Sequence, residues 1–392
     1  MTRNNLNRYV FCYFLLHLCA NFYASAGAVN CSTIAECRTC TMSTDFLVPC
    51  QWCVSTRKCE SAWTVATAKC PEVDRVAHAF NCPLSPPVRY GFLDDFARTR
   101  ALPFIAASSA DTDQQIRTCL ENNVPNTNLL RRYAVSCEFV KIECVAILAF
   151  SPLDNAVVLT FRGTNGPVLI EAINIAIYAQ KDFEPVGGKV VANFYDAFFK
   201  LWKAGLEVDL RQTMFQHPTA ELWVFGHSLG GSIASLAAAW IARLGLIGTE
   251  RIRFVSFGQP RTGNLEFAQT FDNLVPYKYR VVHKGDCVSK LPARIPITDS
   301  SLFHHRYEVW YNNNMLAGDA YEVCESADSS ACSGSVTDPE SLSSTNHLQY
   351  YNVSLYSWFR TGCASRNHLK LRPKFPFHED SNMTESSKAE QE

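Results

Sequence analysis

The sequence predicts an α/β fold in which a mostly parallel central sheet carries helices on both faces, preceded by a small disulfide-rich module. From Tyr90 onward, short apolar runs alternate with helical stretches, and strands separated by helices are typical of a parallel sheet covered on both sides. Eight cysteines crowd into residues 31–82, a density typical of modules held together by disulfides. The predicted strands are Ala156–Phe161, Leu222–Phe225, Arg253–Phe257 and Lys278–His283, with a further strand-like run at Tyr307–Tyr311.

Residues 1–26 are typical of a secretory signal peptide. Arg3 and Arg8 precede an apolar stretch at Tyr9–Ala20, and the small residues of Ala24-Ser25-Ala26 offer a cleavage site. The alternative is an uncleaved membrane anchor, for which the stretch is short. We see no other membrane-spanning segment, because Arg243 interrupts the most apolar helical run. We therefore expect a secreted, extracellular protein.

Length and net charge exclude only some classes of function. The chain has 392 residues, enough for one large domain and a small one. Its formal net charge is −1, with 19% charged residues. Because this balance gives no polybasic field, nucleic acid is not a favoured partner.

Residues 31–82 form the predicted cysteine-rich module. About fifty residues rarely build a sufficient apolar core, so disulfides must hold the module. Its two Cys-x-x-Cys pairs leave zinc as an alternative, but oxidation is favoured in a secreted chain with an even number of cysteines here. The connectivity stays open. The spacing around Cys50-Gln51-Trp52-Cys53 resembles the cysteine-rich module of plexins, semaphorins and integrins, which implies a spacer or adaptor.

The larger domain is expected over residues 90–372, after a linker marked by three prolines at 83, 86 and 87. The polar residues 373–392 are expected to form a disordered tail. Cys324 and Cys332 lie close together in one loop and are expected to pair. The mature chain has an odd number of cysteines, so one thiol is expected to be free or to pair with another chain.

The segment Gly226-His227-Ser228-Leu229-Gly230 joins a predicted strand to a helical run at Ser232–Leu246. A Gly-x-Ser-x-Gly in this setting is a sharp turn that exposes its serine at the top of a sheet. The glycines are needed because the turn has no room for side chains. Ser228 is thus the candidate nucleophile, and the alternative is a glycine-rich turn without chemistry.

A serine nucleophile needs a histidine base and an acid that orients it, in the chain order serine, acid, histidine. Asp286 follows the strand that ends at His283, at the edge where open α/β sheets place their sites. Among the late histidines, His347 opens an aromatic segment in the last ordered part of the chain and is the best candidate base. The remaining late histidines are His304 and His305, expected to be structural, and His368 and His378 near the tail.

Backbone N–H groups must also stabilise the oxyanion of the reaction. One comes from Leu229, the residue after the nucleophile. A second is expected from Thr164, which follows a strand that ends in Phe161-Arg162-Gly163.

Together these segments resemble the class 3 lipases, the α/β-hydrolases typified by filamentous-fungal triacylglycerol lipases. The matching motifs, in chain order, are Phe161-Arg162-Gly163-Thr164, Gly226 to Gly231, Phe257 to Asn264, Asp286 with Leu291-Pro292, and Asn346 to Tyr351. The resemblance covers about Tyr90 to Ala364. It implies an α/β-hydrolase fold and places the triad on Ser228, Asp286 and His347, with Thr164 as oxyanion donor. It also implies a disulfide between Cys119 and Cys363. With that pair formed, one thiol among Cys137, Cys144 and Cys287 is expected to be unpaired.

A lid is expected over residues 168–179. Polar side chains share one helical face there, and the broad remaining face is apolar. In the family, a short helix at this place covers the site. The apolar face is formed by Leu169, Ile170, Ile173 and Ile177, and the alternative is an ordinary core helix.

The sequence thus predicts a secreted serine hydrolase that cleaves lipid esters at an interface through an acyl-enzyme on Ser228, with no metal or cofactor. A phospholipase and an esterase for soluble substrates stay open as alternatives. The rival from another class is a non-catalytic secreted binding protein on a hydrolase fold. The intact serine, aspartate and histidine set argues against that rival.

Overall fold

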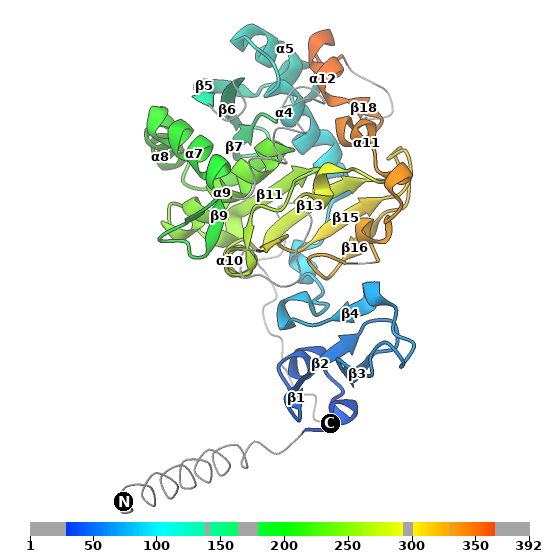
Figure 1. Cartoon of the computed structure of the whole chain (residues 1–392). Coiled ribbons are helices and arrows are strands. Elements are labelled where there is room, and N and C mark those ends of the chain that lie inside the picture. The colour runs from blue at the N-terminus through cyan, green and yellow to red at the C-terminus, as the bar shows by residue number, and fades with distance from the viewer. Residues whose placement is uncertain (1–28, 138–141, 164–178, 293–300, 330, 365–392) are drawn as a thin grey trace, which may run out of the picture.

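An eight-stranded sheet forms the centre of the larger domain (Figure 1). The structure is a computed structural model that describes residues 29–137, 142–163, 179–292, 301–329 and 331–364. The strands lie in the order β16-β15-β13-β11-β10-β7-β6-β5. They are β5 (Asn128–Cys137), β6 (Ile142–Ser151), β7 (Ala156–Phe161), β10 (Glu221–His227), β11 (Ile252–Phe257), β13 (Tyr277–His283), β15 (Glu308–Tyr311) and β16 (Glu322–Cys324).

The middle of this sheet is parallel, as predicted. Each neighbouring pair from β7 through β10, β11 and β13 to β15 is parallel. Antiparallel strands close both edges, with β16 on one side and the hairpin β5–β6 on the other. The hairpin was not among the predicted strands. Burial along β5 is interrupted by exposed residues, so this strand lacks the continuous apolar run that marks the central strands.

Helices cover both faces of the sheet, which explains why β10 is apolar throughout. Leu222 and Val224 point into one core, and Trp223 and Phe225 point into the other. The first core lies under α7 (Ala192–Leu201), α8 (Glu207–Gln216), α9 (Leu229–Arg243) and α10 (Leu265–Leu274). The second lies under α3 (Asp94–Phe96), α4 (Leu102–Ala107), α5 (Asp113–Asn123) and α12 (Leu355–Trp358).

A smaller antiparallel sheet and a short C-terminal hairpin complete this domain. The small sheet has the order β14-β12-β9-β8, with β8 (Gln180–Asp182), β9 (Lys189–Val191), β12 (Gly263–Asn264) and β14 (Leu302–Phe303). The hairpin of β17 (Gln349–Tyr350) and β18 (Val353–Ser354) follows α11 (Ser344–Leu348) directly. The hairpin therefore fixes the chain immediately after α11.

The cysteine-rich module is built around a short sheet. It contains α2 (Cys37–Thr41), β1 (Thr44–Asp45), β2 (Val48–Cys53), β3 (Lys58–Ser61) and β4 (Arg75–Val76). Its eight cysteines pair only with one another, which confirms the prediction of disulfides over zinc. The bonds are Cys31–Cys50, Cys37–Cys82, Cys40–Cys59 and Cys53–Cys70.

Three more disulfides lie in the larger domain. Cys324–Cys332 and Cys119–Cys363 are formed as predicted. Cys137 pairs with Cys144 across the β5–β6 hairpin. Among the described cysteines, the unpaired one is Cys287.

The module docks on the larger domain through Arg306. The guanidinium of this 7% exposed residue donates to the backbone carbonyls of Phe80 and, at 3.0 Å, Cys82, both in the module. It also lies 4.7 Å from the centre of the Phe80 ring and donates to Asp272 at 3.0 Å. Phe80 packs in one apolar cluster with Phe303 of β14. Apolar and charged contacts thus hold the two parts together.

Several predictions from the sequence lie outside the described residues. They concern residues 1–26, Thr164, the lid residues Leu169, Ile170, Ile173 and Ile177, the histidines His368 and His378, and residues 373–392. Within the described ranges, no helix combines the length and apolar character needed to cross a bilayer.

Candidate active site

Ser228 sits on the sharp turn between β10 and α9. Its backbone has φ 57° and ψ −128°, a strained conformation for a residue with a side chain. Its N–H donates to the carbonyl of Phe257 on the neighbouring strand at 2.9 Å. A Cβ on Gly226 would overlap the backbone of Gly230, and a Cβ on Gly230 would overlap the carbonyl of Phe161. Both glycines are thus required, and α9 begins at Leu229 rather than at Ser232 as predicted.

Asp286 and His347 meet beside this turn. The Nδ1 atom of His347 lies 2.9 Å from each carboxylate oxygen of Asp286. Both side chains are buried. Asp286 stands on the turn after β13, and His347 is carried by α11. The N–H of Ser343 donates to the carbonyl of Gly285 at 2.9 Å, so a backbone bond ties the two segments together.

Asp286 is held as a carboxylate by its surroundings. The Val288 N–H donates to Oδ1 at 2.9 Å, and the hydroxyl of Tyr350 donates to Oδ2 at 2.7 Å. Burial raises the pKa of Asp286, but the His347 imidazole and the Tyr350 hydroxyl outweigh it and keep this pKa below its ordinary value. An ionised carboxylate accepts the Nδ1 proton of His347 and so leaves Nε2 as the base.

Gly258 packs directly against Asp286 and His347. It follows β11 with φ +56°, a conformation that favours glycine. A Cβ there would lie 2.5 Å from Oδ2 of Asp286 and 2.7 Å from Nδ1 of His347. Gly258 and Tyr350 were present in the motifs but had no predicted role. The signal for Tyr350 was its place three residues after His347.

Of the two predicted oxyanion donors, Leu229 lies in the described part of the chain and Thr164 lies outside it. Leu229 is the first residue of α9, and the first N–H groups of a helix have no partner within the helix. Its N–H therefore has no acceptor within the helix, as the predicted role of an oxyanion donor requires. The strand β7 delivers Gly163 to the same place, because a Cβ on Gly163 would lie 2.6 Å from the carbonyl oxygen of His227.

Other reactive side chains near the site are structural. His304 and His305 are buried, and burial lowers the pKa of each well below its ordinary value. Burial, and then the neighbouring Asp286 carboxylate, raise the pKa of the Cys287 thiol to about 11. Cys287 is therefore a protonated thiol near neutral pH and a poor nucleophile.

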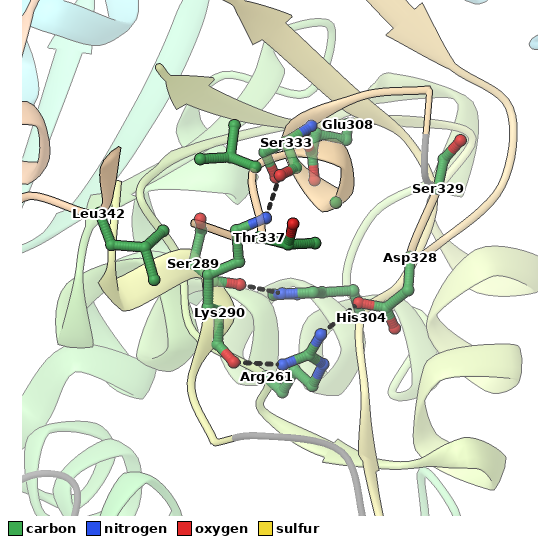
Figure 2. A pocket seen from close by; sticks show the side chains of 12 residues that line it. Arg261, Ser289, Lys290, His304, Glu308, Asp328, Ser329, Ser333, Thr337 and Leu342 are labelled. Carbon is green, nitrogen blue, oxygen red and sulfur yellow. Dashed lines mark hydrogen bonds and ion pairs between the residues drawn. The ribbon is translucent and has the colours of Figure 1, made fainter. Parts of the chain in front are cut away.

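A polar cavity of about 360 Å³ lies behind the loop that carries Asp286. Figure 2 shows Arg261 between the backbone of Lys290 and the carboxylate of Asp328, and His304 reaching Ser289. Ser289 in turn donates to the backbone of Asp286 at 2.8 Å. Residues that line the cavity thus support the loop of Asp286, and Ser228 does not line it.

The part of the chain that contains Ser228 and Asp286 is similar to known proteins. Residues 158–295 match the model of the family described as lipase (class 3). A lipase of Caenorhabditis elegans is 30% identical over 299 residues, which cover 68% of this chain and 83% of that protein. The secreted mono- and diacylglycerol lipase 1 of Fusarium solani is 28% identical over 217 residues, covering 52% of this chain and 59% of that one.

The fold also matches a solved structure. The triacylglyceride lipase of Rhizomucor miehei superposes with a TM-score of 0.56 at 23% identity, over 66% of this chain and 94% of that one. Its α/β-hydrolase fold is the fold described above, including the mostly parallel sheet with helices on both faces. The chain therefore belongs to the class 3 lipase family and is a carboxylic ester hydrolase.

Proposed function

We propose that the protein hydrolyses lipid esters through an acyl-enzyme on Ser228. The observation that carries the proposal is the buried pair of His347 and Asp286, with Nδ1 held 2.9 Å from both carboxylate oxygens beside the strained turn of Ser228. A serine, a histidine and an orienting carboxylate in this order are what nucleophilic ester cleavage needs. The apolar lid face expected from the sequence favours a lipid over a soluble ester.

The proposed steps follow from these positions. His347 takes the proton of Ser228 at Nε2, and Ser228 attacks the ester carbonyl. The amides of Leu229 and Thr164 stabilise the oxyanion, and His347 then gives its proton to the departing alcohol. Water, activated by the same histidine, releases the acid and restores Ser228.

Labelling by a fluorophosphonate that mimics an ester tests the nucleophile directly. We expect a stoichiometric covalent adduct on the peptide that contains Ser228, because only an activated serine attacks the phosphorus. Mass spectrometry of the digested protein locates the adduct. An adduct on another serine would place the nucleophile elsewhere, and a folded protein without any adduct would favour the binding-protein alternative.

We also propose that the protein is secreted as a module, 31–82, joined to a catalytic domain, 90–372. The support is the set of disulfides, which form in oxidising compartments, and the pairing of the module cysteines among themselves. A relative is named a secreted lipase. Asn30-Cys31-Ser32 and Asn352-Val353-Ser354 are acceptor sequences for N-glycosylation, and both asparagines are exposed. A third such sequence, Asn382-Met383-Thr384, lies outside the described residues.

Activity is expected to rise sharply when the substrate forms an interface. The apolar face predicted for 168–179 is unfavourable to expose to water, at about 1.5–3 kcal/mol for each fully exposed aliphatic side chain. An oil surface removes that cost and populates the open state. The rate against tributyrin concentration should turn upward at the solubility limit, and Ile173→Asp should flatten the upturn while keeping soluble-ester turnover. A smooth saturation curve for the unaltered protein would make these residues ordinary core.

A further inference from the structure

His227, the residue before the nucleophile, is buried and contacts His347 in two ways. Its Nε2 atom lies 2.7 Å from the backbone oxygen of His347. The two imidazole rings are also tilted by only 30°, with their centres 4.4 Å apart. No step of the proposed reaction uses the His227 side chain, so these contacts need a separate explanation.

The contacts fix the proton of His227. A carbonyl oxygen only accepts hydrogen bonds, so Nε2 must carry a hydrogen. Burial, and then the nearby His347, lower the pKa of His227 to about 3. The ring is therefore neutral, and Nδ1 is left as an acceptor.

Tyr356 supplies the matching donor. Its hydroxyl lies 3.3 Å from Nδ1 of His227, and because Nδ1 carries no hydrogen, the hydroxyl donates. Tyr356 comes from α12, which follows α11 and its His347 by a few residues. A chain of two hydrogen bonds thus runs from Tyr356 through His227 to the backbone of His347.

The end of β7 packs on the same two side chains. A Cβ on Gly163 would lie 3.0 Å from Nδ1 of His227 and 3.0 Å from the hydroxyl of Tyr356. Gly163 directly precedes Thr164, the proposed oxyanion donor. His227 and Tyr356 therefore touch the nucleophile turn, the base segment and the strand that leads to the oxyanion donor.

We propose that His227 and Tyr356 are positioning residues that set His347 relative to Ser228 and to the strand end at Gly163. The inference rests on the proposed role of His347 as the base. The hydrogen bond from His227 fixes the backbone of His347, and the neutral ring beside it limits rotation of the imidazole. When His347 becomes positively charged, a neutral aromatic face tolerates the charge, whereas a protonated neighbour would repel it. The Tyr356 hydroxyl keeps the His227 proton on Nε2.

Three variants test the chain of bonds. His227→Phe keeps a ring but removes the donor, His227→Gln restores a donor without the ring, and Tyr356→Phe removes only the hydroxyl. Tyr277→Phe is the matched control, because it removes a buried hydroxyl at the start of β13, far along that strand from Asp286. The assay measures kcat and KM on p-nitrophenyl butyrate below its solubility limit, with thermal unfolding as the check on folding.

For His227→Phe we expect kcat to fall about a hundredfold with KM nearly unchanged, because small misplacements of a catalytic group cost this much. His227→Gln should recover part of the loss, and Tyr356→Phe should lose about tenfold. Tyr277→Phe should match the unaltered enzyme. If His227→Phe does not fold, the other two variants still decide the matter.

The inference is overturned if folded His227→Phe and Tyr356→Phe keep the kcat of the control, if only KM changes, or if His227→Gln recovers nothing. The fluorophosphonate adduct separates this failure from that of the proposed function. An adduct on Ser228 with unchanged kcat in the variants overturns the positioning role alone. An adduct elsewhere overturns the proposed function.

Discussion

Replacing Ser228 by alanine is expected to lower kcat on a water-soluble ester by about three to six orders of magnitude. The variant removes the nucleophile, while the Leu229 amide and the buried pair of Asp286 and His347 stay in place. Only the slow attack by bound water is then left. The measurement is the release of p-nitrophenol from a short-chain ester, with active-site titration of the unaltered enzyme as the reference.

Ser235→Ala provides the matched control for this variant. Ser235 is also buried on α9, and its hydroxyl donates to the carbonyl of Ser232 at 2.7 Å. Its loss changes a similar number of buried atoms without touching the triad. We expect Ser235→Ala to keep its turnover, and a Ser228→Ala protein that retains a substantial share of turnover would show that Ser228 is not the nucleophile.

Asp286→Asn is expected to lower kcat by about four orders of magnitude. Asp286 accepts from His347, Val288 and Tyr350 at once. An amide offers one oxygen and one NH₂ group, so it cannot accept from all three. If the NH₂ group faces His347, Nδ1 becomes an acceptor and the proton moves to Nε2, where the base is needed. The geometry is kept and the tautomer is wrong.

The pH profile gives an independent check on this acid. The pKa of Asp286 lies below its ordinary value, so the carboxylate stays ionised to a lower pH than an ordinary aspartate, and loss of activity through its protonation is expected only below that range. Asp209→Asn is the control for the substitution, because Asp209 also accepts from a tyrosine, Tyr133 of β5, at 2.6 Å but lies on α8. If Asp286→Asn kept full turnover, another residue would have to be the acid that orients His347.

The three triad candidates could be chosen from the sequence because Ser228 and Asp286 directly follow predicted strands and His347 opens the last aromatic segment. Their catalytic roles stay predictions. The chain order of serine, acid and histidine leaves all the late histidines open. The place of His347 at the start of the last aromatic segment favours it over His304 and His305, which are buried and bonded to Ser289 and Gln259. Pattern and order are local properties of the sequence, and they suffice where one residue type must follow one kind of element.

Contacts between distant segments were not predictable in the same way. Tyr350 donates to Asp286 although the two are 64 residues apart in the sequence. Gly258 lies against both Asp286 and His347. The neighbouring sequence does not indicate that a tyrosine hydroxyl will bind a distant carboxylate, or that a glycine will pack against a site. The β5–β6 hairpin was not predicted for a related reason. Its edge strand is partly exposed, and the strand forms because it pairs with β6 and not because of its own apolar pattern.

Arg306 makes the two parts of the chain thermodynamically dependent. A guanidinium withdrawn from water needs acceptors around it, and the module supplies two of those of Arg306, while Asp272 and the backbone of Glu325 supply the others. A chain that began after the linker would lose the carbonyls of Phe80 and Cys82 and would uncover the apolar surface of Phe303. The module therefore completes the surface of its neighbour, so harm done to it should appear as a lower yield of folded enzyme, with the kcat of the surviving molecules unchanged.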